Sequence, residues 1–340
     1  MVATPNGLIR AAVVERVGEP PEVGRIEPPQ ETANGTLVAP RYGTLNPIEV
    51  RIAAGREGAA PAVPYVPGME GVGRVVSGDG LDAGSAVRFE CRLPGRGSDG
   101  ALAELAVAEP DSLVALPDGT DEGLAAAVGV IGVTADLALD AAEPIAGARV
   151  VVLGASGSVG GIAVQLAKQR GAARVVAAGR DRAALRRAVE LGADVGIELP
   201  RGADGDAPDD PGPLVEELRE AAGGPIDVVI DPLWGVPGAA AVMALDDGGR
   251  SVNVGQAAGA TTPPPLAALR NRRASLIGLS SGWTPMDRKR RAYQRVLELA
   301  VAGSLEVDRE IVPLAGVSGA WERQSGSPHA KLVIDIGAGA

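Results

Sequence analysis

A run of four apolar residues followed by a glycine-rich turn constrains this chain more than any other feature. Residues 150–153 read Val-Val-Val-Leu, and the turn that follows has the pattern Ala155-x-Gly157-x-x-Gly160. Residues 161–168 then carry apolar side chains at a helical period. A strand, a glycine turn and a helix in this order are typical of a parallel-sheet unit that binds a dinucleotide.

Each part of this turn has a physical role in holding a pyrophosphate. Gly157 has no side chain, so a phosphate can approach the backbone, and Gly160 lets the helix pack closely on the strand. The start of the helix offers unpaired N–H groups and a partial positive charge. A glycine turn in another kind of α/β domain is the alternative. We predict cofactor contacts from the whole turn, which comprises Gly154, Ala155, Ser156, Gly157, Ser158, Val159 and Gly160.

The end of the next predicted strand, residues 174–178, indicates which dinucleotide would bind. An acidic residue there would bind the 2′-hydroxyl of NAD, whereas an arginine would accept the 2′-phosphate of NADP. The chain continues Gly-Arg-Asp-Arg, and a guanidinium binds phosphate through two parallel hydrogen bonds. We therefore predict NADPH, bound by Gly179, Arg180 and Arg182; a surface role for Arg180 is the alternative. Asp181 is interpreted as the N-cap of the following helix.

Length and composition limit the possible classes of protein. A chain of 340 residues suggests two domains. The formal net charge of −11 argues against nucleic acid or an anionic membrane as the main partner. The single cysteine, Cys91, excludes an intrachain disulfide. The sequence has no apolar run of about 18 residues and no signal-peptide pattern, so we expect a cytoplasmic protein.

The predicted elements divide the chain into three segments. Residues 1–121 contain short strands separated by proline and glycine clusters, which indicates a β-rich, barrel-like unit. Over residues 122–279 strands alternate with helices, which predicts a doubly wound parallel sheet of the Rossmann type. Residues 280–340 are expected to return to the first unit, with a helix over 288–302 and a last strand over 332–336. The predicted fold class is α/β with two domains.

Five segments, spread over nearly the whole chain, can be compared with a known family. They are Leu45-Asn-Pro-Ile-Glu49, residues 66–75, Gly132-Val-Thr-Ala135, Ile230-Asp-Pro-Leu-Trp-Gly235 and residues 249–255. Together they resemble the medium-chain dehydrogenase/reductase superfamily, nearest its zinc-free quinone oxidoreductase branch. The resemblance implies a Rossmann NADP-binding domain and a GroES-like catalytic domain. The family segment that resembles 230–235 reads Asp-Pro-Val-Gly-Gly, so Trp234 is a departure.

The same comparison argues against a metal. The zinc enzymes of the superfamily have cysteine or histidine ligands at the positions that we align with Asn46, Met69 and Val130. A catalytic zinc needs three protein ligands and one open position. We therefore expect a metal-free site, in which hydrogen-bond donors polarise the substrate carbonyl.

The resemblance implies hydride transfer to a quinone or to an α,β-unsaturated ketone or thioester. We expect Asn46 to be a polar group at the reacting end; a turn residue before Pro47 is its alternative. Tyr42 and Tyr65 are candidate proton donors, and core packing competes with that role for each. Arg51 stands where many quinone reductases have a tyrosine. It would bind a carbonyl or anionic oxygen only if it points into the cleft.

Further contacts with the nicotinamide are implied for Thr134, Asn253, Val254 and Gly255. For Thr134 the alternative is a hydroxyl bonded to its own helix. Two other functions stay open, namely a zinc-free carbonyl or alcohol oxidoreductase and a cofactor-binding scaffold with little turnover. The resemblance also implies a homodimer that acts on a small-molecule substrate.

Overall fold

A computed structural model of the protein describes residues 7–30, 35–78, 81–109, 111–200, 210–263 and 265–337. The chain forms two compact units, the first made of residues 1–129 and 307–340 and the second of residues 130–306. These divisions lie later in the chain than the boundaries expected after residues 121 and 279. Within the described ranges, no helix is long and apolar enough to cross a membrane.

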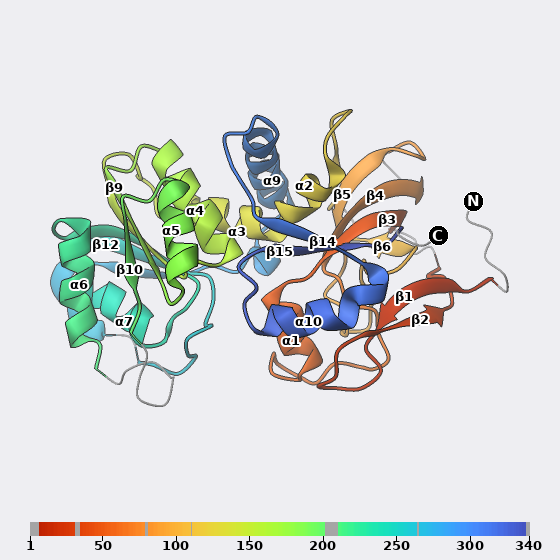
Figure 1. Ribbon diagram of the computed structural model, residues 1–340, viewed down its shortest axis with the longest axis horizontal. Helices are drawn as coiled ribbons and strands as arrows, with labels where there is room; N and C mark the ends of the chain where they lie inside the picture. Colours follow the sequence, from red (N-terminus) through yellow and green to blue (C-terminus); the bar gives the residue numbers. More distant parts are fainter. Residues whose placement is uncertain are drawn as a thin grey trace. The chain divides into compact units, whose positions relative to one another are not determined.

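The second unit is built on a six-stranded parallel sheet with the order β10-β9-β8-β11-β12-β13, of which β9, β10 and β12 are labelled in Figure 1. Its strands are β8 (Arg149–Leu153), β9 (Arg174–Gly179), β10 (Val195–Glu198), β11 (Ile226–Asp231), β12 (Leu245–Asn253) and β13 (Ser275–Gly278). The apolar residues of β8 are fully buried, as expected for a central strand covered on both faces. The predicted doubly wound parallel sheet is confirmed.

Two sets of helices connect these strands. The first set is α4 (Ser158–Gln169) and α5 (Arg182–Glu190), and the second is α6 (Gly212–Ala222), α7 (Gly235–Ala244) and α8 (Leu266–Arg272). Because parallel crossovers are right-handed, the reversal of strand order between β8 and β11 places the two sets on opposite faces. Ligands of such sheets bind at the carboxyl ends of the strands that flank this reversal. The Asp181 carboxylate accepts a hydrogen bond from the Ala184 N–H at 2.7 Å, which confirms the predicted N-cap of α5.

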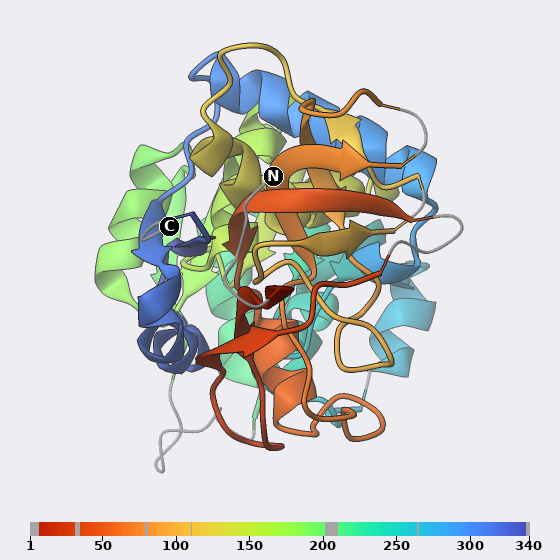
Figure 2. The same cartoon turned by 90° about the vertical axis from the view of Figure 1, so that its right-hand side faces the viewer.

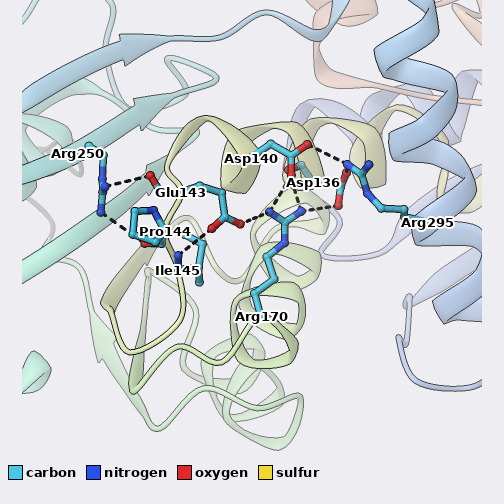
Figure 3. Close-up of polar contacts among 8 residues, drawn as sticks. All are labelled: Asp136, Asp140, Glu143, Pro144, Ile145, Arg170, Arg250 and Arg295. Carbon is cyan, nitrogen blue, oxygen red and sulfur yellow. Dashed lines mark hydrogen bonds and ion pairs between the residues drawn. The ribbon is translucent and has the colours of Figure 1, made fainter.

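Helix α9 (Met286–Val301) lies where the sequence predicts a helix, and it belongs to the second unit. Arg295 of α9 pairs with Asp136 and, at 2.9 Å, with Asp140 of α3 (Gly129–Ala141). Arg170, at the end of α4, pairs with the same two carboxylates at 2.6 and 2.8 Å (Figure 3). The side chain of Asp136 at the centre of this network is only 3% exposed. The network holds α9 against α3, so the chain stays in the second unit beyond the boundary expected after residue 279.

The first unit contains a seven-stranded sheet with the order β14-β15-β3-β4-β5-β7, in which β6 also pairs with β3. The strands are β3 (Thr36–Thr44), β4 (Glu70–Ser77), β5 (Ala86–Glu90), β6 (Ala106–Ala108), β7 (Val114–Ala115), β14 (Arg309–Pro313) and β15 (Lys331–Asp335). A separate hairpin joins β1 (Ile9–Val13) to β2 (Glu22–Ile26). The red and orange strands of this unit face the viewer in Figure 2. The helices and 3₁₀ turns not yet named are α1 (Pro47–Ala53), α2 (Glu122–Ala127), α10 (Val317–Ser325), Ser281–Trp283 and Leu314–Gly316.

The last strand, β15, lies between β14 and β3 of this sheet. It runs antiparallel to β3, with Val333 opposite Thr44. The Leu45 N–H donates to the Leu332 carbonyl at 3.1 Å. This pairing brings Lys331, at the start of β15, beside the residues that follow β3.

Candidate active site

The glycine turn lies at the carboxyl end of β8 and leads into α4. A Cβ added to Gly160 would lie 2.3 Å from the Gly154 carbonyl oxygen, so only glycine allows α4 to start this close to the strand. A Cβ added to Gly157 would meet only that oxygen, at 3.4 Å, so the backbone there is open. The first N–H groups of α4 have no carbonyl one turn earlier in the helix. Bare backbone and unpaired donors together fit a pyrophosphate.

The end of β9 lies against the same turn. A Cβ added to Gly179 would lie 2.9 Å from the Ser156 hydroxyl oxygen. Arg180, the next residue, is exposed, and in the described part of the chain it forms no ion pair. Arg182 is paired with Glu198 of β10. Of the two predicted phosphate ligands, Arg180 is therefore the one whose charge is not already matched by a carboxylate.

Asp231 ends β11 and organises the loop that follows it. It is fully buried, and its Oδ1 accepts hydrogen bonds from the N–H groups of Leu233 and Trp234 at 2.8 and 2.7 Å. The Asn253 Nδ2 donates to Oδ2 at 3.1 Å and to the Gly255 carbonyl at 2.8 Å. Burial raises the pKa of Asp231, and the three donors oppose this. Sequence reasoning missed this role, although an acidic residue directly after three apolar positions is a usable signal.

The loop after Asp231 packs between two of the predicted cofactor segments. A Cβ on Gly154 would lie 3.1 Å from side-chain atoms of Pro232 and Leu233. A Cβ on Gly255 would lie 2.5 Å from the Pro232 carbonyl oxygen. The next residue, Trp234, has φ +48° and ψ −144°. Residues other than glycine rarely adopt this backbone conformation, which costs them about 1–3 kcal/mol.

The remaining predicted nicotinamide contacts lie in the same unit. Thr134, on α3, is 8% exposed, and its hydroxyl donates to the Ser281 hydroxyl at 3.1 Å. The Val254 N–H donates to the Asp231 carbonyl at 2.8 Å, and Val254 itself is partly buried. The amide of Asn253 is used to join the ends of β11 and β12 rather than left free.

The first unit contains a second group of polar residues, which we call the buried polar cluster. Its side chains come from β3, α1, β4, β5 and β15 and from the residue before α1, and each of these residues is at most 2% exposed. The members are Thr44, Asn46, Glu49, Glu70, Arg88 and Lys331. Only Asn46 is a residue that the sequence suggested for the reacting end.

Lys331 fixes the side chain of Asn46. Its Nζ donates to Asn46 Oδ1 at 2.6 Å and to the Leu45 carbonyl at 3.1 Å. An ammonium group can only donate, so the amide oxygen must face Lys331 and the Nδ2 hydrogens point elsewhere. The nearest acceptors of Nδ2 are Thr44 Oγ1 and Glu49 Oε2, both at 3.4 Å. Burial lowers the pKa of Lys331, and the charges of Glu70 and Glu49 oppose this.

Glu49 connects the start of α1 to the start of β4. Its two carboxylate oxygens accept hydrogen bonds from the N–H groups of Asn46 at 2.6 Å and Met69 at 2.7 Å. Burial raises the pKa of Glu49 to about 7, and the charge of Lys331 is the largest opposing effect. The spacing Asn46-x-x-Glu49 is that of a capping box, so the sequence contained a signal for Glu49.

Glu70 completes the cluster. It accepts hydrogen bonds from Thr44 Oγ1 at 2.9 Å and Arg88 Nη2 at 3.1 Å, and Lys331 Nζ lies 3.6 Å away. A Cβ on Gly129 would lie 1.9 Å from Glu70 Oε2, so glycine is required there. The cluster thus places two carboxylates beside two cations. Among the described residues, no three His, Cys, Asp or Glu side chains gather as a metal site.

The other three candidates for the reacting end have different surroundings. The Arg51 guanidinium lies 2.6 Å from Glu57 Oε2, and its side chain is 33% exposed. The Tyr42 ring lies 5.0 Å below the Arg41 guanidinium carbon. Tyr65 is 5% exposed, and in the described ranges its hydroxyl has no hydrogen-bond partner. Burial, together with the charge of Glu49, raises the pKa of Tyr65 to about 12.

The fold and the glycine turn define a two-domain α/β protein of the dehydrogenase type. Two family models match the sequence. The model described as alcohol dehydrogenase GroES-like domain matches residues 32–118, and the model described as zinc-binding dehydrogenase matches residues 158–301.

Known proteins with similar sequences agree with this class. The chain is 32% identical over 241 residues to a probable acrylyl-CoA reductase of Escherichia coli, covering 69% of this chain and 70% of that one. It is 30% identical over 260 residues to a quinone oxidoreductase of Sus scrofa, covering 75% of each. A mycobacterial protein solved in complex with NADPH has the same fold, with a TM-score of 0.81, 22% identity and coverage of 96% and 99%. The chain belongs to the medium-chain dehydrogenase/reductase superfamily, in its quinone oxidoreductase-like branch.

Proposed function

We propose that the protein is an NADPH-dependent, zinc-independent reductase that transfers a hydride to a quinone or to an α,β-unsaturated ketone or thioester. The observation that carries this proposal is the open glycine turn at the reversal of strand order, together with Arg180 at the end of the adjacent strand, which pairs with no carboxylate among the described residues. The names of the two similar reductases support the substrate classes, and the NADPH complex of the mycobacterial neighbour supports the cofactor.

The proposed roles of the residues follow from their chemistry. When bound, NADPH supplies a hydride from C4 of its nicotinamide ring. The turn at 154–160 holds the pyrophosphate and Arg180 holds the 2′-phosphate, which orients the cofactor for transfer. As the hydride reaches the substrate, negative charge grows on the conjugated carbonyl oxygen. The Nδ2 hydrogens of Asn46, oriented by Lys331, are donors suited to stabilise it.

Proton delivery is assigned to Tyr65. A tyrosine hydroxyl is protonated at neutral pH, and burial raises the pKa of this one further. Among the described residues the hydroxyl has no hydrogen-bond partner, so it can donate to an enolate. Arg51 and Tyr42 stay secondary candidates, because Glu57 and Arg41 already contact them.

Arg180→Asp tests the cofactor assignment. Reversing the charge beside a 2′-phosphate should raise the KM for NADPH by much more than tenfold and leave the KM for NADH nearly unchanged, because NADH lacks that phosphate. Steady-state kinetics with both cofactors measures the ratio. Arg186→Asp is the matched control, since this exposed arginine lies one turn further along α5. Equal losses in both variants would contradict the assignment.

Product analysis separates the proposed reduction of a double bond from reduction of a carbonyl. A saturated ketone formed from an enone supports the proposal, and an allylic alcohol supports a carbonyl reductase. Tight NADPH binding without turnover of any quinone, enone or enoyl thioester would favour the scaffold function. We also propose a homodimer, which a sizing column with light scattering tests directly.

A further inference from the structure

We propose that the indole ring of Trp234 forms a wall of the dinucleotide site and stacks on a flat ring of the bound cofactor. This inference rests on the proposed nucleotide site but not on any particular substrate. Trp234 follows β11 by three residues, and β11 and β8 are the two strands between which the strand order reverses. A ligand of such a sheet binds in the crevice outside these strand ends.

The loop that carries Trp234 is held against the predicted cofactor segments on two sides. Pro232 and Leu233 pack on Gly154 of the glycine turn, and the Pro232 carbonyl packs on Gly255 at the end of β12. Glycine at both positions lets the loop approach closely. Trp234, which follows Pro232 and Leu233 directly, therefore lies near the backbone that would hold the cofactor.

The conformation of Trp234 is unfavourable for any residue with a side chain. Its φ of +48° suits glycine, and the family segment that this loop resembles has glycine here. Strained backbone of this kind gathers at ligand-binding positions, where the surrounding structure holds it in place. A tryptophan at such a position puts a large flat surface where the related pattern has none.

Two contacts fix the ring, and a third fixes the backbone that carries it. The Trp234 Nε1 donates to the Thr262 carbonyl at 3.0 Å, and the Trp234 N–H donates to Asp231 Oδ1 at 2.7 Å. A Cβ on Gly238 would lie 2.9 Å from Trp234 Cε3, so one part of the ring packs on α7. One side of the residue packs on the apolar core of the second unit, and the residue as a whole is only partly buried.

The chemistry of a fixed indole selects the kind of group that it binds. Aromatic side chains stack on the flat faces of bases and similar conjugated rings. A nicotinamide dinucleotide carries two such rings, adenine and nicotinamide, and either would suit Trp234. Binding of 2′,5′-ADP, which contains the adenine ring but no nicotinamide, distinguishes the two.

Binding of NADPH to Trp234→Gly tests the proposal by isothermal titration calorimetry. We expect the Kd to rise roughly tenfold, as for the loss of one base–aromatic stack. Trp234→Phe retains a flat ring and should stay within about threefold of the unchanged protein. Loss of affinity for 2′,5′-ADP as well would assign the stack to adenine, and loss only for NADPH would assign it to nicotinamide. Unchanged affinity of the glycine variant for both ligands overturns the proposal.

Tryptophan fluorescence gives a second measurement that needs no glycine variant. The chain has three tryptophans, Trp234, Trp283 and Trp321. Bound NADPH should quench the emission, because reduced nicotinamide absorbs where tryptophan emits. Trp234→Phe should remove most of this quenching, whereas Trp283→Phe, at a residue that is 92% exposed, should retain it. Equal quenching in the two variants overturns the proposal.

Failure of the proposed function gives a different result. If the unchanged protein binds NADPH but reduces no substrate, the reductase function is wrong. The ratio of the NADPH affinities of the unchanged protein and Trp234→Gly still decides the role of Trp234. If the unchanged protein binds neither NADPH nor NADH, the nucleotide site and the role of Trp234 are both wrong.

Discussion

The carboxyl edge of the parallel sheet and the buried polar cluster hold polar groups in different ways. At the sheet edge, the proposed ligand contacts come mainly from backbone groups that the lack of side chains leaves open, as at Gly154, Gly157 and Gly160. In the cluster, six side chains that are each at most 2% exposed contact one another. The edge can be altered with an effect mainly on ligand affinity, whereas removal of a charged member of the cluster leaves a buried charge unmatched.

Lys331→Met should give the largest effect and sharpen this contrast. It removes the cation that lies between Asn46 Oδ1 and Glu70 and leaves buried carboxylates with less compensation. Breaking a buried ion pair from one side costs about 3–5 kcal/mol of unfolding free energy. Urea unfolding followed by circular dichroism measures the loss.

The partly exposed Lys168 provides the control for that experiment. It pairs with Asp194 at 3.1 Å, and its side chain is 33% exposed. Lys168→Met should cost about 0–1 kcal/mol, as surface ion pairs do. A similar loss in the two variants would show that burial of the cluster does not govern its energetics.

Glu49→Gln tests the cluster through pH. Burial raises the pKa of Glu49 from 4.5 to about 7. Between these values the folded state binds the proton more strongly than the unfolded state, so the free energy of unfolding falls as the pH rises through this window. The fall corresponds to about 3 kcal/mol. In Glu49→Gln it should disappear from denaturation curves recorded between pH 4.5 and 7.

Glu322 on α10 is the matched control for the pH experiment. It is exposed, so Glu322→Gln should retain the decline. The proposed state of Glu49 is wrong if its glutamine variant loses stability over this pH range as steeply as the unchanged protein.

The features that the sequence predicted are those encoded by neighbouring residues. The apolar run at 150–153, the glycine turn after it and the N-cap Asp181 each depend on a few consecutive positions. The structure contains the strand, the turn geometry and the cap that these patterns predict. Predicted roles at the reacting end stay predictions, because the fold places Asn46 but does not test its chemistry.

Other features depend on residues far apart and were not predictable in this way. Lys331 meets Asn46 across 285 positions, and no periodicity marks it. Arg295 holds α9 to Asp136 across 159 positions, which explains the later unit boundary. The indole ring of Trp234 depends on Thr262, 28 positions later in the chain, whose carbonyl accepts a hydrogen bond from Nε1 at 3.0 Å. Contacts of this kind follow from the tertiary fold and not from local pattern.

Gly160→Ala, compared with Gly161→Ala, gives the smallest predicted effect and tests the sheet edge with one methyl group. At Gly160 the new carbon would lie 2.3 Å from the Gly154 carbonyl oxygen and 2.7 Å from the Ala155 Cα. Both are backbone atoms, so the turn must shift. A Cβ added to Gly161 would lie 3.8 Å from the Ala155 carbonyl oxygen, which is an ordinary van der Waals distance.

Overpacking of this kind costs about 1–3 kcal/mol, and here the cost should fall on the geometry that holds the pyrophosphate. NADPH affinity, measured by calorimetry, should therefore weaken roughly tenfold or more in Gly160→Ala and stay within about twofold in Gly161→Ala. Circular dichroism should show that both variants retain their helices. Equal affinities in the two variants would mean that the turn tolerates a side chain at Gly160. The sheet edge would then not depend on bare backbone, and this difference between it and the buried polar cluster would be wrong.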